Sequence, residues 1–381
     1  MFRRNGRYDH WLEPWPPKHP VPLSAEGHRT VQMAAELARG ATWQEAPRES
    51  PVLEKRRRAW MTRKIEATAP DLRTLQTWDQ AYELFGVLRQ GARDVNDARF
   101  IRTFVWQFAV GVLEGRERPV RWNLRSVWYR ELRAVLFRLK LLEHNDDPGD
   151  DASVDEVRLG KPTYRGTYLL DLMEDAFQQM FLAGFFRYSD LQVYDARENF
   201  WVLGKERAGV VFFTEKEGLY WLCREIQARF GVTVIASRGS PIWITVDYVV
   251  AALRRRGVSK VLLVCLSDYD PWGYDMGRQV QEKFADPAFG LRRVGVDVLT
   301  GLGLFTPERL ESSKRYLLIG HEKPQDPVHR FVMAWVARTG GIHGEPYGIH
   351  VDHAEPDRVL KAFERWLKER TVLRPAREAD N

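Results

Sequence analysis

From residue 208 onward, strand-like and helix-like segments alternate along the chain, and this pattern constrains the fold more than any other feature. Short runs rich in β-branched and aromatic residues are separated by stretches whose apolar residues recur at helical spacing. The expected strands are 209–213, 231–237, 260–266 and 294–300, and the expected helices are 216–230, 245–257 and 273–284. This order predicts an α/β domain with a mostly parallel sheet flanked by helices.

Carboxylates follow two of these expected strands. Glu215 comes at the end of GVVFFTEKEG, and Asp268 and Asp270 come at the end of KVLLVCLSDYD. Ligands of open α/β sheets bind beyond the carboxyl ends of the strands. If the two strands are neighbours, the three carboxylates converge, and their repulsion raises at least one pKa. Mg²⁺ would relieve this repulsion, because it prefers oxygen ligands.

An Asp-x-Asp pair alone is a weak signal, and N-capping of the following helix is the structural alternative for Asp268 and Asp270. Pro271 and Gly273 favour a ligand site, because proline stops the strand and glycine lets the next helix begin close to a ligand. No lysine lies within this segment, so it offers the aspartates no structural ion pair of its own.

The region from 71 to about 142 has helical patterns instead of strand patterns. Helices are expected in 71–91, 97–115 and 123–143. Between residues 99 and 140, ten Lys and Arg stand against three Glu, an excess larger than the +6 of the whole chain. The pattern fits both a nucleic-acid-binding face and a solvated charged helix. Three short helices with a basic third one resemble a helix-turn-helix or winged-helix module.

The remaining segments complete the expected domain organisation. Residues 1–70 are expected to form a partly irregular extension, because five prolines precede residue 23, with a basic helix in 49–67. A winged-helix domain is expected over 71–160, with an acidic loop in 141–156, and a connecting segment over 161–204. The α/β domain is expected over 205–381 and ends in a helical cap.

Several bulk properties limit where the protein can work. The 44% of hydrophobic residues can bury a core, and no apolar run is long enough to predict a transmembrane helix. The N-terminal residues lack the apolar region of a signal peptide. Cys223 and Cys265 are expected to be buried thiols rather than a disulfide. These features predict a protein that is not secreted and has no membrane partner.

Three motifs follow one another in the α/β region: Glu215-Lys216-Glu217, the stretch from Gly239 to Thr245, and the stretch from Asp268 to Gly273. They resemble the motifs of the Toprim domain in the topoisomerase VI A subunit and in its meiotic relatives, the double-strand-break transesterases. The resemblance implies a Toprim domain in which Glu215, Asp268 and Asp270 bind Mg²⁺. It departs at Val246, where the family often has an arginine that contacts DNA or the partner subunit.

The same family carries a nucleophilic tyrosine on a winged-helix domain ahead of the Toprim domain, four residues after an arginine and directly after an aromatic residue. Arg125, Trp128 and Tyr129 fit this spacing. On a helix, Arg125, Tyr129 and Arg133 would share one face. The two guanidiniums would favour the phenolate and hold the attacked phosphate. An amphipathic tyrosine at a helix edge is the structural alternative.

The neighbouring face of this helix is expected to belong to the core. Its apolar positions are Trp128, Leu132, Val135, Leu136 and Leu139. Arg130 and Arg238 are expected, like Arg125 and Arg133, to contact DNA.

The resemblance implies Mg²⁺-dependent cleavage of both DNA strands by a homodimer, with Tyr129 and Arg125 as catalytic residues and a 5′-phosphotyrosine link. Such a type IIB topoisomerase A subunit, located at the nucleoid or in the nucleus, works with a separate ATPase subunit of the B type. This chain has no P-loop of its own. Two alternatives stay open: a Toprim nuclease that hydrolyses plasmid or foreign DNA without a covalent intermediate, and an inactive DNA-binding scaffold.

Overall fold

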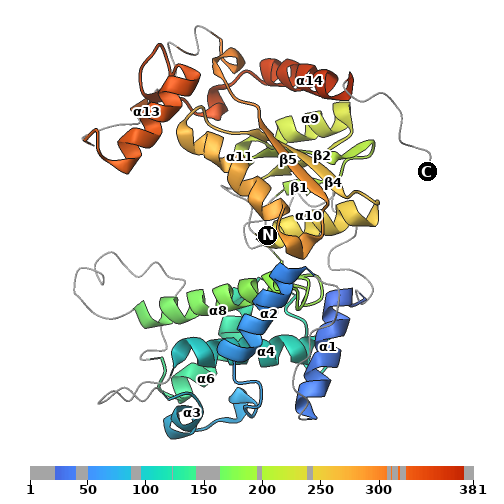
Figure 1. The fold of residues 1–381 in the computed structure, drawn as a ribbon, viewed down its shortest axis with the longest axis vertical. Coiled ribbons are helices and arrows are strands. Elements are labelled where there is room, and N and C mark those ends of the chain that lie inside the picture. Colours follow the sequence, from blue (N-terminus) through green and yellow to red (C-terminus); the bar gives the residue numbers. More distant parts are fainter. Residues whose placement is uncertain are drawn as a thin grey trace, which may run out of the picture. The chain divides into compact units, whose positions relative to one another are not determined.

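The computed structural model describes residues 22–39, 50–86, 96–121, 123–142, 164–194, 200–237, 243–306, 310, 316–317 and 323–372. These residues divide into two compact units, a helical one up to residue 194 and an α/β one from residue 200 (Figure 1). The presence of one helical unit and one α/β unit confirms the predicted fold class, α/β plus α. No helix in the described ranges is both long and apolar enough to cross a membrane.

The helical unit is built around two long helices that pack against each other, α4 and α8. Its elements are α1(Ala25–Ala38), α2(Pro51–Arg63), η1(Leu72–Thr74), α3(Trp78–Phe85), α4(Asp97–Leu113), α5(Arg125–Val127), η2(Trp128–Leu132), α6(Arg133–Arg138) and α8(Tyr164–Leu182). Phe108 of α4 meets Phe177 of α8 edge to face, with ring centroids 6.3 Å apart. The described part of this unit contains no β-strand, so the winged-helix arrangement stays a prediction.

Helices from the first 70 residues are part of this unit. The predicted basic helix is present as α2, and two of its arginines, Arg56 and Arg57, bind backbone carbonyl groups, whereas Arg58 is exposed. Arg56 Nη1 donates to Leu182 O at 2.9 Å, and Arg57 Nε donates to Ala183 O at 2.8 Å, so both cap the carboxyl end of α8. The segment predicted to connect the domains supplies α8 itself, which buries its apolar face against α4.

The α/β unit contains a five-stranded sheet in the order β1-β3-β2-β4-β5. Its strands are β1(Phe200–Val202), β2(Arg207–Thr214), β3(Val232–Ala236), β4(Lys260–Leu266) and β5(Arg293–Val298). The four predicted strands are confirmed, and they are parallel. The fifth strand, β1, was not predicted, because an antiparallel strand of three residues is too short to leave a pattern in the sequence. A second sheet pairs β6(Tyr316–Leu317) with β7(Tyr347–Gly348).

Helices cover both faces of the five-stranded sheet (Figure 1). They are α9(Tyr220–Phe230), α10(Trp243–Arg255), α11(Pro271–Phe284), α13(Pro327–Thr339) and α14(Pro356–Val372). On one face Phe212 and Val264 share a core cluster with α9, α13 and α14. On the other face α11 approaches closely at Gly277, where a Cβ would lie 3.0 Å from Val298 and 3.3 Å from Val296.

Phe363 of α14 is a central residue of this core, and we expect Phe363→Ala to lower the free energy of unfolding by about 3–5 kcal/mol. Its fully buried ring lies 5.3 Å from Phe212, 5.2 Å from Phe230 and 5.6 Å from Trp366 between centroids. Denaturant unfolding of the full chain measures the loss. Phe331→Ala removes an equally large ring that is 41% exposed and should cost about 0.5 kcal/mol or less. Equal losses in the two variants would contradict this assignment of the core.

Candidate functional site

The carboxyl ends of β2 and β4 bring Glu215 and Asp268 to the same edge of the sheet. The two strands are parallel neighbours in which Thr214 pairs with Leu266. The condition set for convergence of these carboxylates, that the two strands are neighbours, is therefore met. Because Glu215 directly follows β2 and Asp268 follows β4 by two residues, both acids leave the sheet at nearly the same level.

Asp268 is buried and bonded through both carboxylate oxygens. Oδ1 accepts from the Val351 amide at 2.8 Å, and Oδ2 lies 2.9 Å from Lys216 Nζ and 3.0 Å from His350 Nδ1. Burial raises the pKa of Asp268, but these three partners outweigh it and hold the pKa below its ordinary value. These bonds hold the carboxylate in one orientation and favour its ionised form.

Lys216 corrects the expectation that the aspartates lack a structural ion pair. The lysine comes from the end of β2, and the parallel register carries it to Asp268. Burial lowers the pKa of Lys216, but the hydrogen bond and charge of Asp268, together with the charges of Glu215 and Asp352, outweigh burial, so the net shift is upward. No inspection of the Asp268 segment alone could find this pair, because the two residues are far apart in sequence.

Glu215 is held differently from Asp268. It is half-buried, and desolvation together with the charge of Asp268 raises its pKa, while Lys216 partly offsets the effect. This direction agrees with the rise expected for at least one pKa in the cluster. A carboxylate whose charge is disfavoured in this way gains most from a bound cation.

Asp270 caps a helix. Its Oδ1 accepts from the Gly273 amide at 2.6 Å at the start of α11, where Pro271 is the first helical residue. The structural alternative therefore applies to Asp270 but not to Asp268. A Cβ at Gly273 would lie 2.2 Å from the Asp268 carbonyl oxygen, so close backbone approach, rather than ligand access, explains this glycine.

The donor set suits a hard divalent cation only after one rearrangement. Among the residues that the structure describes, no three His, Cys, Asp or Glu side chains are grouped closely enough to hold a metal ion. Glu215 and Asp268 supply carboxylate oxygens, which Mg²⁺ prefers. The ammonium of Lys216 already lies against Asp268 Oδ2, so a cation at that oxygen requires Lys216 to turn away. With that change, Glu215 and Asp268 would offer carboxylate oxygens of the kind that Mg²⁺ prefers.

The segment between β7 and α14 adds site residues that the sequence analysis did not name. His350 and Val351 contact Asp268, and Asp352 lies 3.9 Å from Lys216. Pairing between Tyr269 and Ile349 fixes this segment beside the aspartates. The sequence carries one signal for these residues: His350 and the stretch VDHAEP that follows it contain two histidines and two acids. Only the tertiary fold shows which strand end these residues meet.

Tyr129 lies in the helical unit, on the π-helical turn η2(Trp128–Leu132). Its side chain is 38% exposed, and the Arg133 guanidinium stands over its ring at 5.9 Å from the centroid. The core positions predicted for this helix are confirmed, because all of them are buried: Trp128, Leu132, Val135, Leu136 and Leu139. A π-helical turn within a helix, such as the one that carries Tyr129, is frequently found at a functional site.

The other predicted DNA contacts differ in how they are held. Arg125 is half-exposed, with Nε 3.8 Å from Glu174 Oε1. Arg130 is also exposed, and its Nη1 donates to the Val120 carbonyl oxygen at 3.4 Å. Arg238 lies outside the described residues.

Part of the local positive charge has a structural use. Arg99 pairs with Glu66 at 2.5 Å, and Arg138 donates to Leu75 O at 2.9 Å. The count of basic residues between 99 and 140 therefore overstates the charge available to a nucleic acid.

A scan of the sequence against protein-family models finds no match, and a search of curated proteins finds no significant relative.

Proposed function

We propose that this protein cleaves double-stranded DNA by tyrosine transesterification, in the manner of a type IIB topoisomerase A subunit. In this proposal the helical unit is the winged-helix-like part and the α/β unit is the Toprim-like part. The observation that carries it is the pair of carboxylates at neighbouring strand ends, where burial and the charge of Asp268 raise the pKa of Glu215. Lys216 offsets this rise only in part, so a bound cation would stabilise the pair further.

Tyr129 is the proposed nucleophile. Its Oη forms a bond to a backbone phosphorus, the bond from that phosphorus to O3′ breaks, the phenol proton leaves to solvent, and the departing O3′ takes up a proton. The products are a 5′-phosphotyrosine link and a free 3′-hydroxyl. Arg133, 5.9 Å from the Tyr129 ring centroid, favours the phenolate electrostatically, and Arg125 is free to turn towards the attacked phosphate.

The carboxylates have a supporting role in this reaction. Mg²⁺ at Glu215 and Asp268 would neutralise charge on the phosphate and on the leaving oxygen. Asp270, which caps α11, orients the turn that carries Asp268. On turning away from Asp268, Lys216 would present its ammonium to the same phosphate.

We further propose that two copies act together, one cutting each strand, and that a separate ATPase subunit controls the opening of the dimer. Both proposals rest on the resemblance of the motifs around Glu215, Asp268 and Tyr129. The covalent link retains the energy of the phosphodiester bond, so a cut of this kind can be resealed.

A second candidate is hydrolysis of DNA by the α/β unit without Tyr129. His350 favours it, because its ring lies 3.0 Å from Asp268 Oδ2 and remains 48% exposed. A histidine oriented by a carboxylate can accept a proton from an attacking water.

Incubation of the full chain with supercoiled plasmid and Mg²⁺, stopped with detergent, tests both candidates. We expect protein bound to the 5′ ends of linear DNA, and EDTA should prevent its formation. Free 5′ phosphates without an adduct would assign the protein to the hydrolytic class. If the plasmid stays intact and calorimetry shows no binding of Mg²⁺, the inactive DNA-binding scaffold would be the remaining alternative.

A further inference from the structure

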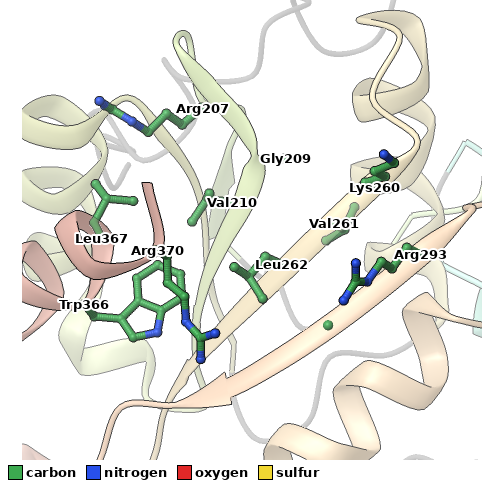
Figure 2. A pocket seen from close by; sticks show the side chains of 11 residues that line it. Arg207, Gly209, Val210, Lys260, Val261, Leu262, Arg293, Trp366, Leu367 and Arg370 are labelled. Atoms are coloured by element: carbon green, nitrogen blue, oxygen red, sulfur yellow. The ribbon is translucent and has the colours of Figure 1, made fainter. Parts of the chain in front are cut away.

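A pocket of about 600 Å³ opens at the opposite edge of the five-stranded sheet, where the strands begin. Its walls come from the first residues of β2, β4 and β5 and from the last turns of α14 (Figure 2). Six residue steps separate Lys260 from Leu266 along β4, which places the pocket about 20 Å from the carboxylate edge. The pocket is therefore distinct from the site proposed for cleavage.

The floor of the pocket is apolar and flat. Val210, Leu262 and Gly295 are cross-strand partners in one row of the sheet, on the face that α14 covers. Gly295 keeps this row open, because it carries no side chain and a Cβ there would lie 3.0 Å from Leu262 Cδ1. The Trp366 indole of α14 forms a side wall (Figure 2), and its Nε1 is held by Asp297 at 2.9 Å.

The rim of the pocket is cationic. Lys260 and Arg293 are direct partners at the start of β4 and β5, and both are exposed. Like charges directly opposite each other destabilise a sheet. Within the described residues neither side chain has a hydrogen-bond or ion-pair partner. Two further cations line the rim, but both have partners: Arg207 donates to the Phe230 carbonyl at 2.9 Å, and Arg370 is paired with Asp297 at 2.7 Å.

We propose that this pocket binds a compact aromatic anion, a planar ring that carries a phosphate, of about the size of one nucleotide. The ring would lie on Val210 and Leu262 against Trp366, and the phosphate would lie between Lys260 and Arg293. An anion there removes the repulsion between the two cations. The volume falls within the range of about 300–1,000 Å³ that small-molecule sites occupy.

Calorimetric titration of the full chain with AMP tests this proposal. AMP has both parts of the expected ligand, whereas adenosine lacks the anion and inorganic phosphate lacks the ring. We expect saturable binding of AMP, and both control ligands should bind at least about tenfold more weakly, since each loses about 1.4 kcal/mol or more of contact energy. Binding of phosphate as tight as that of AMP would show that the apolar floor takes no part.

Two variants of the protein localise the binding. Lys260→Ala combined with Arg293→Ala should weaken AMP at least about tenfold. Arg254→Ala combined with Arg255→Ala removes the same charge from the exposed end of α10, outside the pocket, and should change the affinity by less than about twofold. Leu262→Phe keeps all charges but fills the floor, so it should also weaken AMP at least about tenfold. It serves as the test if the double variant fails to fold.

Three results would overturn the proposal. The first is no saturation by AMP in the wild type. The second is an equal loss in the pocket variant and the α10 variant, which would indicate general attraction to positive charge. The third is a gain of AMP affinity when residues 373–381 are removed, which would assign the pocket to the carboxyl-terminal segment of the chain itself. None of these results depends on DNA cleavage, so failure here is distinguishable from failure of the proposed function.

Discussion

We expect Tyr129→Phe to lower formation of the covalent protein–DNA adduct by at least about a thousandfold, because it removes the only atom of this side chain that can attack phosphorus. The substitution keeps the aromatic ring under the Arg133 guanidinium at 5.9 Å. The side chain is 38% exposed, so loss of one hydroxyl should change the free energy of unfolding by less than about 0.5 kcal/mol. Adduct trapped with detergent on plasmid DNA is the measured quantity.

Tyr168→Phe is the matched control for this experiment. Tyr168 belongs to α8 of the same helical unit and is 51% exposed, so its substitution makes the same chemical change on a comparable surface. The control should form adduct at the wild-type rate. Undiminished adduct in Tyr129→Phe would remove Tyr129 from the mechanism, and an equal loss in both variants would indicate an indirect effect on folding or DNA binding.

The centre of the sheet could be predicted from the sequence because β2, β3 and β4 are largely buried on both faces. A run such as Val211, Phe212 and Phe213 has no polar alternation, and in a βαβ series such runs indicate central parallel strands. The same reasoning placed Glu215 and Asp268 at one edge correctly. It failed for β1, whose three residues owe their strand conformation to pairing with β3 rather than to their own pattern.

Contacts between distant segments account for most of what the sequence did not predict. The pairing of Lys216 with Asp268 depends on strand register, and the position of His350 depends on a bridge between Tyr269 and Ile349. The role of Arg57 depends on where α8 ends. In each case the local sequence is equally consistent with an exposed side chain, and only the tertiary fold selects the partner.

The turn that carries Tyr129 shows a different limit. Arg125, Tyr129 and Arg133 were placed on one face by assuming 3.6 residues per turn, whereas residues 128–132 form a π-helical turn, in which the Arg133 amide bonds to the Trp128 carbonyl. The wider turn still brings Arg133 over the Tyr129 ring. An inserted residue of this kind leaves no pattern in a single sequence, because the core positions on either side remain apolar.

We expect Glu215→Gln to abolish stabilisation of the protein by Mg²⁺ without destabilising the fold. Burial and the charge of Asp268 raise the pKa of Glu215, so its ionised form is disfavoured in the native state, and a neutral isostere should leave the stability unchanged or higher. Asp268 is a poorer choice for this test, because asparagine would disturb the bonds to Lys216, His350 and the Val351 amide.

The expected size of this effect follows from linkage between metal binding and folding. At ten times its dissociation constant, Mg²⁺ should stabilise the wild type by about 1.4 kcal/mol, which corresponds to a rise in Tm of roughly 3–6 °C for a unit of this size. Thermal unfolding with Mg²⁺ and with EDTA measures the rise. Glu206→Gln changes a carboxylate that is 75% exposed just before β2, and it should keep the full rise. A rise of equal size in Glu215→Gln would place the cation elsewhere, and no rise in the wild type would remove Mg²⁺ from the proposed site, since a cation held by Glu215 and Asp268 must stabilise the strand ends that carry them.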